Sequence, residues 1–260
     1  MEGLTVIIPM NEFGKENIEL LNKAVESVPN DIRVILSIPN NAEAKDVKGI
    51  SDRLQIVQET DETSFADLVN SAVEKIDDKW FSILEFDDTY TNIWFDNVEK
   101  HIEYMPEVSV FMPLEDITDF NNNSFIGFGN EAALASSFSN ELGYIDNDCL
   151  QNYFDFYMTG SIFNTADWKE VGGLKPNIKV TFWYEWLLRL TNKGKKVYVI
   201  PKVGYNHKLG RKGSLVEMYK ETVSEEESNF LFELAKREYL FHPSIPRDPS
   251  KFIYEENTKN

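Results

Sequence analysis

The chain has 260 residues, of which 42% are hydrophobic and 13% aromatic, so it can bury a core of the size needed by one large domain. Its 44 acidic residues outnumber 26 basic ones, and the formal net charge is -18. A field of this sign repels polyanions, which makes duplex nucleic acid a poor partner. The single cysteine, Cys149, excludes an intramolecular disulfide and a cysteine-based zinc site, and it favours a reducing compartment.

The amino terminus, MEGLTVIIPMNEFGKEN, lacks the basic region of a secretory signal, and its apolar run is too short to cross a membrane. No later stretch reaches the roughly 18 consecutive apolar residues of a membrane helix. We therefore expect a cytoplasmic protein without a transmembrane segment. The sequence leaves the oligomeric state open, a homo-oligomer included.

Short apolar runs alternate with segments of helical periodicity in the first part of the chain. The expected strands are residues 4–10, 32–38, 54–59, 80–86 and 108–114. The expected helices are residues 17–28, 64–76 with Ser64 as the N-cap, and 93–105. This alternation predicts an α/β fold with a mostly parallel sheet flanked by helices.

The second part of the chain begins with a polar, Asn-rich stretch, 115–155, that has some helical character at 130–138. The pattern then predicts a strand and a short helix over 158–173, a helix over 182–194, a strand over 195–200 and an amphipathic helix over 225–241. We expect a single domain over residues 1–214, followed by a C-terminal helix and an irregular tail over residues 215–260.

Three acidic residues, Glu85, Asp87 and Asp88, follow directly on the apolar run WFSIL. Ligands of open α/β sheets bind outside the carboxyl ends of the strands. Two neighbouring carboxylates at such a place can hold Mn²⁺ or Mg²⁺, whose remaining coordination positions are filled by diphosphate oxygens. A solvated acidic turn would have the same letters, so this cluster alone leaves both interpretations open.

Five phrases, in this order along the chain, resemble those of the family 2 glycosyltransferases of the GT-A fold. They are TVIIPMNE at 5–12, SFADLVNSAVEKIDDKWFSILEFDD at 64–88, MTGSIFNTADWKEVGGL at 158–174, LLRLTNKGKKVYVIP at 187–201 and YNHKLGRKGSL at 205–215. The chain looks like a divergent member of that family over about residues 4 to 215. The resemblance implies a GT-A (Rossmann-like) mixed sheet and a nucleotide-diphosphate-sugar donor that lies over the carboxyl edge of the first strands.

The resemblance also implies roles for individual residues. Asp87 and Asp88 would hold the Mn²⁺ or Mg²⁺ ion as a DXD-like motif, with His207 as a further ligand. The residues implied in donor binding are Pro9, Asn11, Glu12, Asn70, Glu85, Lys208, Arg211 and Lys212. The last three form a basic loop suited to close over the diphosphate. For His207 and for this loop, a solvated surface position is an equally good interpretation.

The candidate catalytic base is where the sequence departs from the family. Inverting members use an Asp in an acidic pair that precedes an Arg corresponding to Arg189. Counting back from Arg189 places Phe182 and Trp183 at that pair. Glu185 keeps a carboxylate in this segment and is therefore the candidate base, because a Trp cannot take a proton. A polar contact within the helix is the other interpretation of Glu185.

Two functions follow from these patterns. The first is a metal-dependent inverting glycosyltransferase that moves a sugar from a nucleotide-diphosphate-sugar donor to a hydroxyl acceptor. The second is a GT-A-like domain that has lost catalysis and acts as a structural or interaction protein, with the aromatic segments 152–158 and 181–186 as a contact surface instead of ordinary core. A nucleotidyltransferase of similar fold would share the acidic cluster, but IIPMNEFGKE lacks the Gly-rich, basic phosphate loop of that class.

Overall fold

The computed structural model describes residues 3–42, 49–58, 64–138 and 141–239. Its strands are β1 (Leu4–Pro9), β2 (Arg33–Ser37), β3 (Leu54–Val57), β4 (Trp80–Ile83), β5 (Thr89–Tyr90), β6 (Val108–Asp119), β7 (Phe125–Gly129), β8 (Tyr144–Ile145), β9 (Ile162–Asn164) and β10 (Lys196–Leu209). Its helices are α1 (Lys15–Glu26), α2 (Phe65–Glu74), α3 (Trp94–Tyr104), α4 (Asn147–Asn152), α5 (Thr165–Val171), α6 (Phe182–Asn192), α7 (Leu215–Thr222) and α8 (Glu225–Glu238), with a 3-10 turn at Glu131–Leu134.

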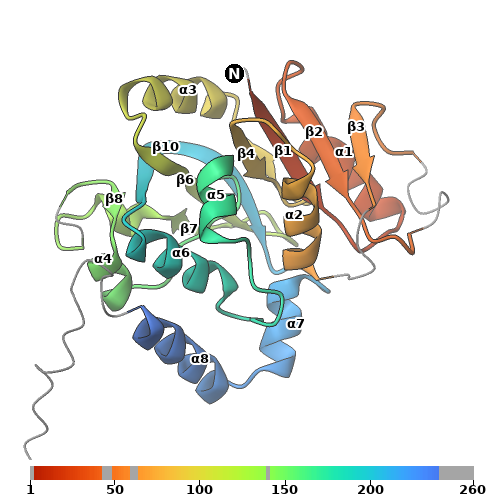
Figure 1. Cartoon of the computed structure of the whole chain (residues 1–260). Helices are drawn as coiled ribbons and strands as arrows, with labels where there is room; N and C mark the ends of the chain where they lie inside the picture. The colour runs from red at the N-terminus through yellow and green to blue at the C-terminus, as the bar shows by residue number, and fades with distance from the viewer. Residues whose placement is uncertain (1–2, 43–48, 59–63, 139–140, 240–260) are drawn as a thin grey trace, which may run out of the picture.

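Within these ranges the strands form one sheet in the order β3-β2-β1-β4-β9-β6-β10-β5, with β7 added on β6 and β8 on β10 (Figure 1). Parallel pairing joins β3, β2, β1 and β4, and it also joins β6 and β10. The short strand β9 lies between β4 and β6 and is antiparallel to both. The carboxyl ends of β1, β4, β6 and β10 therefore lie at one edge of the sheet. This mixed sheet flanked by helices confirms the predicted fold class.

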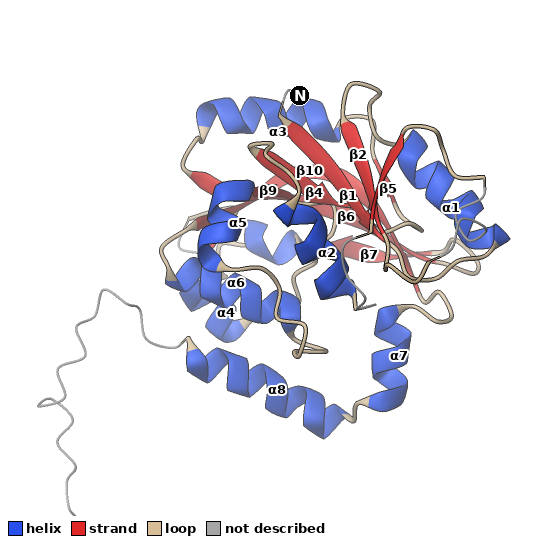
Figure 2. Cartoon of the chain, turned by 45° about the vertical axis from the view of Figure 1, so that its right-hand side comes forward, coloured by secondary structure: helices blue, strands red, loops and turns tan. Residues whose placement is uncertain are grey.

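Apolar side chains cover both faces of the sheet, because successive residues of a strand point to opposite faces. On β1, Ile7 packs in the layer that contains α2, α5 and α6, whereas Val6 and Ile8 pack against α1 and α3. Figure 2 shows α2, α5 and α6 in front of the sheet. Helix α2 begins where the sequence predicts, since the Oγ atom of Ser64 accepts a hydrogen bond of 3.1 Å from the backbone N–H of Asp67.

Strand β10 is longer than predicted. The strand expected at 195–200 continues to Leu209 because it pairs with the equally extended β6, through several register shifts. His207 and Lys208 therefore lie on a strand instead of in a loop, and the basic loop is shortened to the residues after Leu209. In the polar stretch, the helix expected at 130–138 is only a 3-10 turn, and β7 was not predicted.

Two helices, α7 and α8, follow β10, where the sequence predicted one. Ser214 and Ser224 cap them, because each Oγ accepts a hydrogen bond from the backbone N–H three residues later. Helix α8 packs on α6. The division of the chain at residue 214 stays a prediction, and the expected irregular tail from residue 240 lies outside the described residues. No helix within the described ranges is long and apolar enough to cross a membrane.

Candidate functional site

The acidic cluster is a tight turn after β4 that is bonded to β10. The backbone N–H of Glu85 donates to the hydroxyl of Tyr205 at 3.1 Å, and the Oδ1 atom of Asp88 accepts from the N–H of Lys208 at 2.6 Å. The ring of Tyr205 fits because Gly160 has no side chain: a Cβ atom there would lie 2.3 Å from a ring carbon. The position of the acidic turn is thus set by its contacts with a strand more than a hundred residues away.

His207 lies between two buried carboxylates. Its Nδ1 atom is 3.4 Å from Oδ2 of Asp88 and 3.6 Å from Oε2 of Glu115. Glu115 is fully buried on β6, and neither of its carboxylate oxygens has a hydrogen-bond partner among the described residues. Burial raises the pKa of Glu115 to about 8. Burial would lower the pKa of His207, but the carboxylates of Asp88, Glu115 and Glu85 raise it to about 10. Sequence reasoning missed Glu115 because no motif marks it.

The carboxylates of the acidic turn are largely buried and repel one another, which disfavours their ionised form. Burial, together with the charges of Asp88 and Asp87, raises the pKa of Glu85 to about 8. Burial and the charge of Asp88 also raise the pKa of Asp87, although the guanidinium of Arg211 acts in the opposite direction. A cation placed among these carboxylates would favour their ionised form and be bound in return.

Arg211 is a protein cation that already contacts this turn. Its Nε atom donates to Oδ2 of Asp87 at 2.6 Å, and its Nη1 atom donates to Oε2 of Glu12 at 2.9 Å. Its guanidinium also lies over the ring of Phe86, 4.6 Å from the ring centroid. Arg211 therefore joins the end of β1 to the turn after β4, which brings three of the predicted site residues together.

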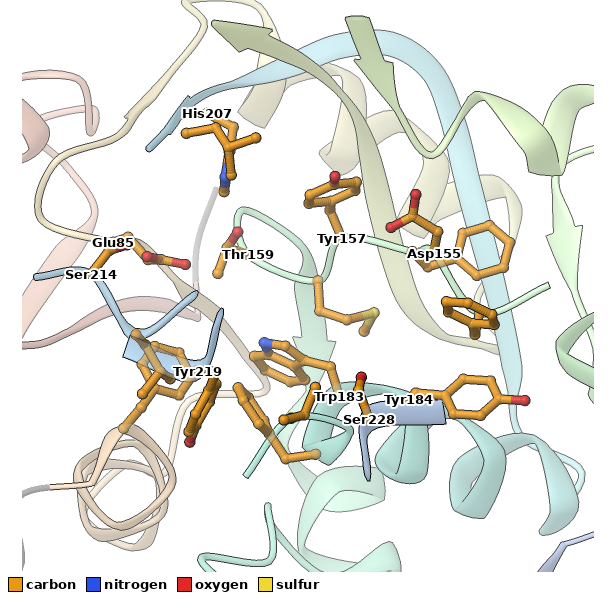
Figure 3. A pocket seen from close by; sticks show the side chains of 18 of the residues that line it. Glu85, Asp155, Tyr157, Thr159, Trp183, Tyr184, His207, Ser214, Tyr219 and Ser228 are labelled. Atoms are coloured by element: carbon orange, nitrogen blue, oxygen red, sulfur yellow. The ribbon is translucent and has the colours of Figure 1, made fainter. Parts of the chain in front are cut away.

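A cavity of about 600 Å³ opens beside the acidic turn, a size typical of ligand sites. Glu85, Asp87 and His207 line one end of it, and Figure 3 shows the carboxylate of Glu85 and the ring of His207 pointing into it. Segment 154–159, the first turn of α6 and helices α7 and α8 supply the other walls.

The predicted donor residues at β1 lie outside this cavity. Pro9 is the buried last residue of β1, and Asn11 and Glu12 follow it at the same edge of the sheet. Of the predicted basic loop, Lys208 lines the cavity but its Nζ atom donates to Oδ1 of Asn123 at 2.7 Å. Lys212 is exposed. A donor that used both regions would therefore extend along the sheet edge from β1 into the cavity.

Asn70 makes contacts within the protein instead of facing the cavity. Its Nδ2 atom donates to the carbonyl of Leu174 at 2.7 Å, and its Oδ1 atom accepts from the N–H of the same residue at 3.0 Å. The approach is close, since a Cβ atom at Gly173 would lie 2.1 Å from Oδ1 of Asn70. Helix α2 thus holds the loop after α5, and this geometry argues against a donor contact of Asn70.

We expect Asn70→Ala to lower the free energy of unfolding by about 1–3 kcal/mol, because both backbone groups of Leu174 lose their partner. Donor binding is expected to stay as in the wild type. Urea unfolding and ligand titration measure the two effects. Asn97→Ala serves as the control, since Asn97 bonds the exposed carbonyl of Ile93 in its own helix. Normal stability combined with lost donor binding would contradict this structural role.

The carboxylate of Glu185 contacts three side chains, those of Arg189, Lys175 and Tyr239. Nε and Nη2 of Arg189 donate to its two carboxylate oxygens, each at 3.0 Å. Nζ of Lys175 and the hydroxyl of Tyr239 each lie 2.7 Å from Oε1. Burial would raise the pKa of Glu185, but the hydrogen bonds from Arg189, Lys175 and Tyr239 lower it. The side chain is 1% exposed and does not line the cavity. A general base must lie within hydrogen-bond distance of the acceptor hydroxyl and have a pKa high enough to take its proton. The geometry and the lowered pKa of Glu185 therefore argue against its predicted role as the catalytic base.

The first turn of α6 presents aromatic residues to the cavity where the resemblance implied an acidic pair. Phe182, Trp183 and Tyr184 all line it. From the other aromatic segment, Phe154 lines the cavity while half exposed, and Met158 lines it while buried. The aromatic segments are therefore divided between the core and the wall of a cavity.

The predicted metal ligands were Asp87, Asp88 and His207. Asp87 and His207 line the cavity, but Asp88 does not. Within the described ranges, no group of three or more His, Cys, Asp or Glu side chains is arranged to hold a metal ion. Mg²⁺ in nucleotide sites is commonly bound by one or two carboxylates, with substrate phosphates and water completing the coordination. The crowded carboxylates fit this kind of site, in which Asp87 would supply the protein's oxygen ligand.

The chain has the GT-A-like fold of glycosyltransferases, as the alignment with two solved structures shows. Residues 1–349 of TarS from S. aureus, in complex with UDP-GlcNAc, align with a TM-score of 0.62 and 13% identity over 89% of this chain and 65% of that one. The mannosyltransferase PcManGT from Pyrobaculum calidifontis, in complex with GDP-Man and Mn²⁺, aligns with a TM-score of 0.59 and 15% identity over 81% of this chain and 58% of that one.

At these identities the likeness establishes the fold alone. The chain spans less than two thirds of the length of both neighbours. No protein-family model and no curated protein sequence matches it.

Proposed function

We propose that this chain is a metal-dependent inverting glycosyltransferase, a divergent member of family 2, that moves a sugar from a nucleotide-diphosphate-sugar donor to a hydroxyl acceptor. The observation that carries the proposal is that Glu85, Asp87 and His207 line one end of a cavity at the carboxyl edge of the sheet. The neighbours in complex with UDP-GlcNAc, and with GDP-Man and Mn²⁺, support a donor of this class.

The donor would extend along the sheet edge, with its nucleotide next to Pro9, Asn11 and Glu12 and its sugar in the cavity. A divalent cation bound by Asp87 would neutralise charge on the leaving diphosphate. His207 would become a further ligand on loss of a proton, because a metal binds the neutral imidazole and the carboxylates of Asp88, Glu115 and Glu85 raise the pKa of His207 to about 10. Arg211 contributes a second positive charge at the same place. Its guanidinium would move from Asp87 to the diphosphate, which frees the carboxylate of Asp87 when the donor arrives.

A second candidate function is a GT-A-like domain that has lost catalysis and acts as a structural or interaction protein. The observation that favours it is the burial of Glu185 among Arg189, Lys175 and Tyr239, with aromatic residues facing the cavity from the first turn of α6. If transfer is retained, the remaining carboxylates of the far walls, Asp155 and Glu225, are the groups positioned to accept the proton.

A screen of UDP-, GDP-, CDP- and dTDP-sugars with and without Mn²⁺ tests both functions. We expect one donor to raise the melting temperature in a Mn²⁺-dependent manner, because a ligand at 100 times its Kd stabilises the native state by about 2.7 kcal/mol. Release of nucleoside diphosphate in the same sample, with water accepting the sugar in place of the acceptor hydroxyl, supports the transferase. A thermal shift without release supports a donor-binding domain that has lost catalysis. The absence of any shift would overturn the transferase, and together with self-association it would support the second function.

Arg211→Gln is expected to affect metal and donor binding in opposite directions. Mn²⁺ alone should bind more tightly, because Asp87 loses a competing cation. The nucleoside diphosphate should bind about tenfold more weakly or worse, because a charged hydrogen-bond donor is removed. Calorimetric titrations with MnCl₂ and with UDP or GDP measure the two changes. Lys202→Gln is the control, since that lysine is exposed and lies outside the cavity. Unchanged Mn²⁺ affinity in Arg211→Gln would count against the shared site.

A further inference from the structure

The cavity continues beyond the acidic turn into a half whose lining is different. This acceptor half lies between segment 154–159, the first turn of α6, and helices α7 and α8. Its walls are mainly aromatic, and the rings belong to Phe65, Phe154, Phe182, Trp183, Tyr219 and Phe232. In Figure 3, Trp183 lies across the cavity from His207.

The neighbouring rings fix the orientation of Trp183. Its indole is nearly parallel to Phe163, with an interplanar angle of 10° and 6.0 Å between centroids, and nearly perpendicular to Trp186, at 86°. Phe65 and Phe182 pack beside it, with centroids 6.0 Å and 5.6 Å away. Trp183 therefore offers a rigid apolar surface, which loses little conformational entropy when a flat ligand packs against it.

The polar groups of the acceptor half are acidic or neutral. Asp155 and Glu225 supply carboxylates, and Thr159 and Ser228 supply hydroxyls. Among the described residues that line the cavity, Lys208 is the cationic side chain besides His207. Lys208 lies at the acidic turn, and its Nζ atom donates a hydrogen bond to Asn123. An acceptor with phosphate or carboxylate groups would meet like charge in this half. A long aliphatic chain would bury these carboxylates without a hydrogen-bond donor for them.

We propose that the acceptor half binds a neutral carbohydrate, whose sugar ring packs on Trp183 and whose hydroxyls donate to Asp155 and Glu225. A pyranose has both required features, an apolar face of C–H groups and several hydroxyl donors. This inference rests on the proposed function, since it assigns the acceptor of the same cavity. In the transfer, the acceptor hydroxyl oxygen bonds to the anomeric carbon of the donor. The bond from that carbon to the diphosphate oxygen breaks, with its electron pair left on the diphosphate. The hydroxyl proton passes to a carboxylate of the cavity.

Saturation-transfer NMR on the full chain tests the acceptor class. The probes are neutral oligosaccharides of glucose, galactose, mannose and N-acetylglucosamine, an oligomer of glycerol phosphate, and the isoprenoid alcohol farnesol, each with UDP or GDP present. We expect saturation to pass from the protein to the ring protons of at least one neutral oligosaccharide. Tighter binding of glycerol phosphate or farnesol than of every neutral oligosaccharide would overturn the inference, and so would the absence of any saccharide binding.

Variants then locate the binding. Trp183→Ala is expected to weaken the saccharide by about tenfold, whereas Trp183→Phe, which keeps an aromatic face, retains most of the affinity. Asp155→Asn provides a second test that leaves the aromatic packing intact, and it should weaken the same saccharide. Tyr104→Ala is the control, because Tyr104 is 83% exposed and lies outside the cavity. Wild-type affinity in both Trp183→Ala and Asp155→Asn would overturn the inference.

The donor-dependent thermal shift, measured on the same samples, separates this inference from the proposed function. A donor shift with no saccharide binding overturns the acceptor assignment alone. Saccharide binding that depends on Trp183, with no donor shift, supports a carbohydrate site in the cavity and overturns the transferase proposal.

Discussion

Asp87→Asn is expected to remove the Mn²⁺-dependent stabilisation by the nucleotide-sugar donor and to weaken donor binding by at least about 100-fold. Asp87 lines the cavity and binds the guanidinium of Arg211 at 2.6 Å, so it already pairs with a cation at the proposed site. Asparagine keeps the shape and one oxygen but removes the charge. The divalent ion would then lose its charged protein ligand, and the diphosphate that binds through this ion would be held more weakly.

Titration of the donor at fixed Mn²⁺ and in EDTA measures this effect. A matched control is Asp167→Asn, since Asp167 also pairs with a cation, Lys195, but lies outside the cavity. The control should keep the Mn²⁺-dependent donor shift. If Asp87→Asn retains that shift in full, the cation is bound elsewhere and the assignment of Asp87 fails.

Glu185→Gln is expected to lower the free energy of unfolding by about 3 kcal/mol, which corresponds to a fall in melting temperature of roughly 10 °C. Glutamine has the same size, but it leaves the charges of Arg189 and Lys175 without their carboxylate. Arg189 also donates to the carbonyls of Gly172 and Gly173, so the loss extends to the loop after α5. The effect is a structural one, and it is measured by urea unfolding.

The pH dependence of this effect has a definite sign. The pKa of Glu185 is lowered in the folded state, so its contribution to stability is complete above the ordinary glutamate pKa. That contribution is lost as the pH falls through the lowered pKa of the folded state. The difference in unfolding free energy between wild type and Glu185→Gln should therefore be largest at neutral pH and shrink in acid.

Glu107→Gln is the control for Glu185→Gln, because Glu107 pairs with Lys196 on the surface at 3.3 Å and exposed pairs contribute little. A Glu185→Gln protein of normal stability that has lost sugar transfer, with an unchanged KM for the donor, would restore Glu185 as the catalytic base.

The sequence determined the features that depend on neighbouring residues. The buried strands need contiguous apolar runs and the helices need apolar residues at a spacing of about 3.6, so the first half of the sheet and the cap at Ser64 were predictable. The acidic turn after β4 was predictable for the same reason, since it directly follows one of those runs. The order of the five phrases then indicated the GT-A fold, which the structure and its neighbours confirm.

The tertiary structure decided which side chains meet. Arg211 reaches Glu12 across 199 positions of sequence, and Asn70 reaches Leu174 across 104. Strand β10 continues to Leu209 because β6 is there to pair with it, and that extension places His207 beside Glu115. Such contacts are formed by hydrogen bonds and charges between distant segments, which leave no periodicity in either segment alone. For this reason the sequence located the acidic turn, whereas only the folded chain separated the carboxylates that face the cavity from Glu185, which is bound within the protein.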